Sequence, residues 1–425
     1  MNRSRALVAG SLVVFLACGT LLVLAAARLL SASDYTVFAA FSAVFGFAVL
    51  GPAGALEQRA AVLARPGTSG TDAARHMARP AALTTLAVVA LALIPVGGWQ
   101  QALFGEQDTL ASVLLAVGTP VVGATAVLRG VALGQGRNVA PAASNVGTGL
   151  ASLALTAALV GVGASRLEAF LVGPVAAWML ALVIMGVAEA RESRRGSGRQ
   201  SLAVDARGHL TASAWTVTAN LLMLANLLIV PALLRLQVDV VGPDAVAATQ
   251  LLVSMSRLVS SVMLGLVPVE IAHLASRQPG PSQRRVARGW VAAALAVSAA
   301  AVLVLTLTGG PLAAFISGKP VDVGPGLAFL AVAPVLALTP TLAAVPAGLI
   351  AGRERRIASG WALGLAVLLG AAGLLAASGL EPLLLAVLLS ATLPALTIIP
   401  LTGSLGRRKT RVPFRNEDAS AESPG

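Results

Sequence analysis

Residues 7–30 read LVAGSLVVFLACGTLLVLAAARLL, an apolar run in which Arg28 is the only charged residue. About 20 apolar residues in a helix cross the hydrocarbon core of a bilayer, and a helix satisfies its own backbone hydrogen bonds without water. The run therefore predicts a membrane-spanning helix. Arg3 and Arg5 before it resemble the start of a signal peptide, but the run exceeds a typical signal-peptide core and further apolar runs follow. We therefore expect it to remain as the first helix.

Similar apolar runs recur along the chain, which has 425 residues, 57% of them hydrophobic and 11% charged. With a mean hydropathy of +0.85, such a chain needs lipid as its solvent. The predicted fold class is an all-α polytopic membrane protein. We expect about 12 transmembrane helices, at residues 7–30, 35–56, 81–98, 110–133, 139–163, 168–188, 211–234, 245–270, 289–309, 324–350, 357–378 and 382–403.

Basic residues lie almost entirely in alternate connections between these helices. One side holds 25 of the 30 Lys and Arg residues, whereas the other holds only Arg28, Arg166, Arg235 and Lys319. Because basic residues near a span stay on the cytoplasmic side, we predict cytoplasmic termini in a multi-pass protein of the cell inner (plasma) membrane. The net charge of +12 then faces anionic headgroups, so membrane lipids are expected partners and nucleic acid is not.

The longest polar connection, RESRRGSGRQSLAVDARGH, divides the helices into two sets of six. We expect an N-terminal six-helix lobe at 1–190, a cytoplasmic linker at 191–210, a C-terminal six-helix lobe at 211–403 and a disordered cytoplasmic tail at 404–425. An even number of helices returns the chain to its starting side, so the two lobes are parallel and related about the membrane normal. We expect a central cavity between them.

An internal repeat supports the two lobes, because the fourth and tenth spans share the same short features in the same order. The matched residues are Thr119-Pro120, Gly130 and Gly134 in the fourth span, and Thr339-Pro340, Gly348 and Gly352 in the tenth. EQRAAVLAR after the second span likewise parallels EIAHLASR after the eighth. Gly-x-x-x-Gly alone usually means only close helix packing, so the inference rests on the shared order.

Arg257 is the one basic residue inside a predicted span, about twelve positions into 245–270 and roughly 18 Å along the helix. A guanidinium at mid-membrane costs at least about 2.5 kcal/mol, so it should face a water-filled cavity or a partner. Gln250, Ser254 and Ser261 share its helical face and predict a cavity wall. A planar guanidinium suits phosphate oxygens, so a diphosphate headgroup is a sensible ligand.

The alternative for Arg257 is a structural role, held by helix carbonyls or by Asn220 or Asn226. A second polar stripe in 139–163, Asn145, Thr148, Ser152 and Thr156, fits either a cavity or helix packing. Arg28 either snorkels to the interface or lines a cavity mouth. The predicted substrate-binding cavity residues are Arg257, Gln250, Ser254, Ser261, Asn220, Asn145 and Arg28.

Interior prolines remove a helix hydrogen bond, which neighbouring groups or cavity water must satisfy. Pro120, Pro334 and Pro340 are therefore predicted gating or hinge positions, with static kinks as the alternative. Glu57 and Arg59, and Glu270 with Arg277, are interpreted as interfacial charges at inner helix ends. No Walker A, Gly-x-Ser-x-Gly or His-Glu-x-x-His motif occurs, and the histidines lack metal-ligand spacing. We expect no enzyme activity, metal or cofactor, and ion coupling stays open.

Three stretches resemble the polysaccharide-exporter branch of the multidrug/oligosaccharidyl-lipid/polysaccharide (MOP) flippase superfamily: ARLLSASDYTVFAAF at 27–41, GPAGALEQRAA at 51–61 and LRGVALGQGRN at 128–138. Ser31-Ala32-Ser33 departs from the usual Gly-Pro turn. The resemblance implies a V-shaped transporter that flips polyprenyl-diphosphate-linked oligosaccharide to the outer leaflet by alternating access. Arg257 would then hold the diphosphate, and glycan-assembly enzymes would be partners.

Other functions remain open. A multidrug or small-cation exporter of the same superfamily would be expected to carry acidic residues well inside a span, and none is evident in the sequence. A membrane-embedded glycan polymerase or ligase should need a sizeable external loop, whereas the longest external loops hold about a dozen residues. A non-transporting scaffold in envelope polysaccharide assembly is the third alternative.

Overall fold

The computed structural model describes residues 3–46, 51–64, 69–93, 108–195, 208, 210–222, 243–275, 281–317 and 324–378. In the N-terminal half the helices are α1 (Arg3–Leu29), α2 (Ala32–Phe45), α3 (Gly51–Leu63), α4 (Gly70–Leu93), α6 (Asp108–Gly134), α7 (Val139–Gly161) and α8 (Arg166–Arg195). In the C-terminal half they are α11 (Pro243–Ala275), α12 (Pro281–Ser317), α13 (Pro325–Val332), α14 (Val335–Ile350) and α15 (Glu354–Ser378), and residues 210–222 are also helical. Every regular element in these ranges is a helix, which confirms the predicted all-α class.

Several helices have the length and composition of membrane spans. They are Ala6–Leu29, Thr109–Gly134, Val139–Gly161, Arg166–Arg194 and Arg285–Phe315. Two shorter apolar helical stretches, Val259–Ile271 and Leu338–Ile350, belong to the packed interior of the C-terminal half. The described helices therefore form a multi-pass membrane protein, as the apolar runs predict.

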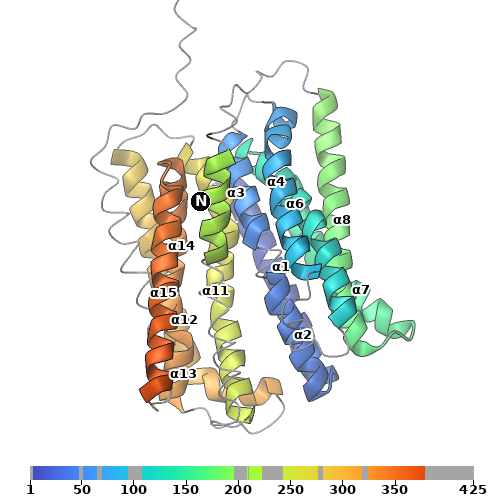
Figure 1. Ribbon diagram of the computed structural model, residues 1–425, viewed down its shortest axis with the longest axis vertical. Coiled ribbons are helices and arrows are strands. Elements are labelled where there is room, and N and C mark those ends of the chain that lie inside the picture. Colours follow the sequence, from blue (N-terminus) through green and yellow to red (C-terminus); the bar gives the residue numbers. More distant parts are fainter. Residues whose placement is uncertain are drawn as a thin grey trace, which may run out of the picture.

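The helices form two groups that follow the two halves of the sequence (Figure 1). The N-lobe, α1 to α8, packs around Phe38, Phe41, Leu115 and Phe170. The C-lobe, residues 210–222 with α11 to α15, packs around a separate core that includes Trp361. At one end of the bundle, α3, α6, α8, α11 and α14 finish and α1, α4, α7, α12 and α15 begin. We call it the basic end, because the basic connections lie there; α2 and α13 lie toward the opposite end (Figure 1).

Two predicted spans are each covered by two of the helices. In the expected span 35–56, α2 reaches Phe45 and α3 begins at Gly51-Pro52, and residues 47–50 lie outside the described ones. The expected span 324–350 is interrupted at Ala333-Pro334, between α13 and α14. Proline carries no backbone N–H and fixes its own φ, so it is tolerated in a first turn but interrupts a continuous helix. An apolar run alone does not predict the interruption at Ala333-Pro334.

α6 packs against α3 through two glycines. A Cβ on Gly130 would overlap the carbonyl oxygen of Glu57, and one on Gly134 would overlap that of Ala64. The predicted Gly-x-x-x-Gly motif therefore allows two helix backbones to approach closely. This close contact sets the position of α6 along α3, beside Glu57.

The same turn ends α6 and α14, as expected for an internal repeat. Gly136 and Gly352 have positive φ values of 75° and 64°. The next residues, Arg137 and Arg353, each donate their backbone N–H to the carbonyl five residues earlier. Glycine is favoured at such a left-handed position. The structural repeat thus aligns Gly136 with Gly352, whereas the sequence match pairs Gly134 with Gly352.

Candidate functional site

The two lobes meet around the tripeptide Glu57-Gln58-Arg59 in the middle of α3. Glu57 turns toward α6 of its own lobe, and its carboxylate lies 3.3 Å from Arg129 Nη2. Gln58 and Arg59 contact the C-lobe instead. One turn of α3 therefore joins the N-lobe core to the partner lobe, near the basic end.

Arg59 forms a buried ion pair with Glu354 at the start of α15. Arg59 Nη1 lies 3.1 Å from Glu354 Oε1, and the two side chains are only 8% and 10% exposed. Removing one partner of such a pair typically costs about 3–5 kcal/mol, because the other charge is left buried without compensation. The interpretation of Glu57 and Arg59 as interfacial charges was wrong, since both are enclosed between helices. Glu270 is buried as well.

Gln58 and Asn220 bind each other across the same interface. Asn220 Nδ2 donates to Gln58 Oε1 at 3.3 Å, and Gln58 Nε2 donates to Asn220 Oδ1 at 3.5 Å. Asn220 Nδ2 also donates to the Thr216 carbonyl at 3.0 Å, which holds the amide in place. Asn220, predicted as a cavity residue, thus lies at the contact between the lobes. A small cavity of about 10 Å³ adjoins this amide pair.

Apolar side chains seal the interface beside these polar pairs. Val8 and Leu12 of α1 pack with Leu133 of α6 and Val269 of α11 in one buried cluster. Gly265 of α11 faces Leu12 so closely that a Cβ there would lie 2.8 Å from the leucine Cδ2. The lobes are therefore in direct contact at the basic end through both polar and apolar groups.

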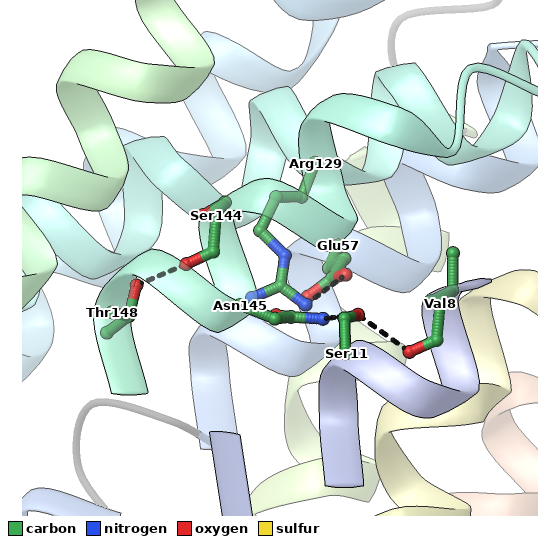
Figure 2. A network of polar contacts seen from close by, with 7 residues as sticks. All are labelled: Val8, Ser11, Glu57, Arg129, Ser144, Asn145 and Thr148. Carbon is green, nitrogen blue, oxygen red and sulfur yellow. Dashed lines mark hydrogen bonds and ion pairs between the residues drawn. The ribbon is translucent and has the colours of Figure 1, made fainter. Parts of the chain in front are cut away.

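Polar contacts inside the N-lobe lie beside the Arg129–Glu57 pair (Figure 2). Asn145 of α7 donates from Nδ2 to Ser11 Oγ of α1 at 3.0 Å, and Ser11 donates to the Val8 carbonyl at 2.8 Å. Figure 2 shows Arg129 reaching toward Glu57 beside Asn145. Asn145 is 1% exposed, so the structure places this predicted cavity residue within the N-lobe core.

Two further residues of the α7 polar stripe, Thr148 and Ser152, bond to their own helix. Thr148 donates to the Ser144 carbonyl at 2.7 Å, and Ser152 donates to the Thr148 carbonyl at 2.8 Å. Such back-bonding satisfies a hydroxyl inside an apolar core without a partner from another helix. In this conformation these two hydroxyls belong to helix packing.

Arg28 makes a second contact between the lobes, at the opposite end. Its Nη2 donates to the Phe315 carbonyl of α12 at 3.3 Å, and the guanidinium carbon lies 5.7 Å from the Phe315 ring centre. Both side chains are exposed. The contact is therefore weaker than the buried pairs at the basic end, because water competes for the same groups.

The predicted polar stripe of α11 is described only in part. Gln250, Ser254 and Arg257 lie on the helix, but their side chains fall outside the described residues. Ser261 is partly buried. The preceding residue, Ser260, is buried, and its hydroxyl lies 3.0 Å from that of Thr339 on α14. Asn226 and Arg235 fall outside the described ranges.

Two of the predicted hinge prolines lie within helices. Pro120 lies inside α6 and Pro340 inside α14, whereas Pro334 immediately precedes α14 at the break after α13. A hinge role at these positions stays a prediction. Among the residues the structure describes, no group of three or more His, Cys, Asp and Glu side chains could hold a metal ion.

Solved transporter structures resemble this fold, whereas no protein-family model and no curated protein sequence matches the chain. The MATE transporter NorM-NG, solved in complex with a monobody, superposes with a TM-score of 0.72 at 15% identity, over 95% of this chain and 93% of that one. A MOP superfamily transporter from Pyrococcus furiosus gives 0.65 at 13%, over 95% and 96%. A multidrug resistance MATE family transporter in an outward-facing conformation gives 0.63 at 14%, over 95% and 96%.

These likenesses establish a fold class: the chain has the helical architecture of MATE-type transporters of the MOP superfamily. All three of these structures are of transporters, and none is of an enzyme. At 13–15% identity the likeness concerns the fold alone.

Proposed function

We propose that this chain is an exporter that works by alternating access, and that its basic end faces the cytoplasm. The observation that carries the proposal is the closed contact between the lobes at the basic end, built from Gln58, Arg59, Asn220 and Glu354. The one-sided distribution of basic residues supports the orientation. In this conformation the path from the cytoplasm is shut.

The contact has the composition of a gate. A buried ion pair contributes little net stability, because the cost of removing both charges from water offsets most of their attraction. When the lobes separate, Arg59 and Glu354 regain hydration, so the closed and open states can differ by little free energy. A purely apolar interface would lose its burial energy on opening. The pair therefore specifies the closed geometry without making it permanent.

Small organic molecules, including cations, are the first substrate class that we propose. The fold is shared with MATE transporters, and one of them is a multidrug resistance transporter. The sequence offers few acidic residues in its spans, but Glu57, Glu270 and Glu354 are enclosed between helices. Buried carboxylates therefore do occur in this chain, with Glu57 and Glu354 paired with arginines near the basic end.

Lipid-linked oligosaccharide is the second class, and one observation favours it. Arg257 lies in the middle of the 33-residue helix α11, where a permanent positive charge is expensive and suits a diphosphate. Partnership with glycan-assembly enzymes belongs to this second proposal. A scaffold without transport activity is the remaining alternative, and we propose coupling to an ion gradient for either transported substrate.

Reconstitution in liposomes separates the candidates. Efflux of an organic cation above the rate of empty liposomes supports the first class, and exposure of a labelled lipid-linked glycan on the far leaflet supports the second. Each assay is repeated with and without an imposed proton or sodium gradient. If neither substrate moves under any gradient, the scaffold reading replaces the exporter.

Arg257→Ala tests the second class in particular. The variant should abolish glycan flipping while leaving folding and organic-cation efflux intact, and Arg257→Lys should retain only part of the flipping because it lacks the planar fork. Normal flipping by Arg257→Ala would rule out the proposed diphosphate contact.

A further inference from the structure

Four exposed arginines lie at the basic end of the C-lobe. Arg285 and Arg288 belong to the first turns of α12, and Arg355 and Arg356 belong to the first turn of α15. We call these four residues the arginine patch. They take no part in the contact between the lobes described above.

A tryptophan lies beside each half of the patch. Trp290, two residues after Arg288, packs against the C-lobe core that also contains Ile357, two residues after Arg355. The guanidinium carbon of Arg355 lies 5.7 Å from the centre of the Trp215 ring, which packs against the same core. Each pair of arginines thus lies near a tryptophan that packs on the C-lobe core.

The patch lacks acidic neighbours within its own helices. No Asp or Glu occurs between Pro281 and Ser317, and the one acidic residue of α15, Glu354, is bound to Arg59. In the N-lobe, by contrast, the pairs Arg75–Asp72, Arg129–Glu57 and Arg137–Glu189 form within the lobe. The four arginines therefore carry positive charge that no carboxylate of their own helices offsets.

The surroundings of α12 indicate where that charge lies. Only 17% of its apolar window, within Arg285–Phe315, is buried in the protein, compared with 28–50% for the other long spans. Most of α12 therefore faces lipid, and Arg285 and Arg288 follow at its basic end. Arginine and tryptophan at the end of a lipid-facing helix lie at the depth of the headgroups.

We propose that the arginine patch binds the phosphate groups of anionic lipid headgroups. The guanidinium forks donate paired hydrogen bonds to phosphate oxygens, and the tryptophans pack at the boundary between headgroups and acyl chains. Anionic lipid then anchors the C-lobe beside Glu354 of the lobe contact, because Arg355 and Arg356 directly follow Glu354 in the first turn of α15. This site is independent of the transported substrate.

The test measures the preference for anionic lipid in bilayers. The full chain is reconstituted in phosphatidylcholine vesicles that contain brominated phosphatidylglycerol or brominated phosphatidylcholine, and tryptophan quenching gives the relative binding constant. Trp215 and Trp290 report from the patch itself. Each arginine near an anionic surface contributes roughly fivefold to binding. The variant with Gln at all four patch positions should therefore lower the phosphatidylglycerol preference by at least tenfold.

A matched control removes the same number of charges from the N-lobe. The residues changed to Gln are the exposed arginines at its basic end, Arg75, Arg79, Arg191 and Arg194. General attraction to an anionic surface predicts the same loss for this control, whereas a site at the patch predicts a change within about twofold. An equal loss in both variants would mean general electrostatic attraction and would overturn the proposal, as would no loss in either.

Two further measurements complete the test. If the fourfold patch variant does not insert, Arg288→Gln alone should lower the preference by roughly fivefold, and an unchanged preference would again overturn the proposal. Inorganic phosphate added to the wild-type vesicles should leave the quenching unchanged. If it displaces phosphatidylglycerol at low concentration, the patch is a site for soluble phosphate and the lipid assignment is wrong.

Discussion

Removing the Glu354 charge should open the lobe contact at the basic end. In Glu354→Gln, Arg59 stays 7% exposed in the closed state but has lost the negative charge of Glu354. In the open state the same guanidinium is hydrated in both proteins. The substitution therefore penalises the closed state alone.

The size of the effect follows from the burial of the pair. Removing one charge of a buried pair costs about 3–5 kcal/mol, and 1.4 kcal/mol corresponds to a tenfold change in an equilibrium constant. The glutamine can still accept a hydrogen bond from Arg59 Nη1, so we expect the lower value. The ratio of closed to open molecules should fall by about 100-fold.

Distance measurements between spin labels can follow this shift. Cys18 is the only cysteine and is buried, so Cys18→Ala provides a background for labels at Arg75 of α4 and Ser359 of α15. Both positions are exposed, and they belong to different lobes. The wild-type protein should give mainly the short distance, and Glu354→Gln should give mainly a longer one.

The exchanged pair Arg59→Glu with Glu354→Arg is the matched control, and it should restore the short distance. Should Glu354→Gln keep the wild-type distance distribution while it folds normally, the ion pair does not hold the lobes together. Failure of the exchanged pair to recover would indicate that Arg59 acts through other contacts.

Three smaller changes test neighbouring features. Gln58→Leu leaves the Asn220 amide without its partner and should favour the open state by about 1–3 kcal/mol in the same distance assay; replacing Asn220 by Leu as well should recover part of this loss. Gly134→Ala forces a methyl group against the α3 backbone, so it should cost about 1–3 kcal/mol and lower the thermal unfolding temperature. Its control is Gly19→Ala, where the space around the α-carbon is open and the unfolding temperature should stay nearly unchanged. Gly265→Val should prevent α11 from closing on α1, making cysteines introduced at the basic end more reactive to a water-soluble maleimide, and unchanged reactivity would show that the gap adapts.

The helical architecture could be predicted because lipid imposes simple rules. Runs such as 7–30 and 139–163 match α1 and α7 to within a few residues, since only a helix satisfies its backbone in hydrocarbon. Breaks within an apolar run were harder to place. Pro334 was recognised as a special position, but three other prolines in the same run gave equal reason to expect a break elsewhere.

The contact between the lobes could not be predicted from local patterns. Arg59 and Glu354 are 295 positions apart, and each alone resembles a charge at a helix end. The sequence did contain one signal. Glu57-Gln58-Arg59 directly follows the small, apolar stretch GPAGAL, and in the structure these charged residues lie within the helix α3 and not beyond its end. Asn220 is predicted as a cavity residue because it is polar within an apolar run, but its partner in the structure, Gln58, lies in the other lobe.

The central claim is that the lobes open alternately at their two ends, and paired distances at both ends test it most directly. One label pair spans the basic end at Arg75 and Ser359, and the other spans the opposite end at Val162 and Gly326, all of them exposed. In liposomes, addition of substrate or of an ion gradient should lengthen one distance and shorten the other in the same sample. Distances that stay fixed at both ends, or that change together, would contradict alternating access.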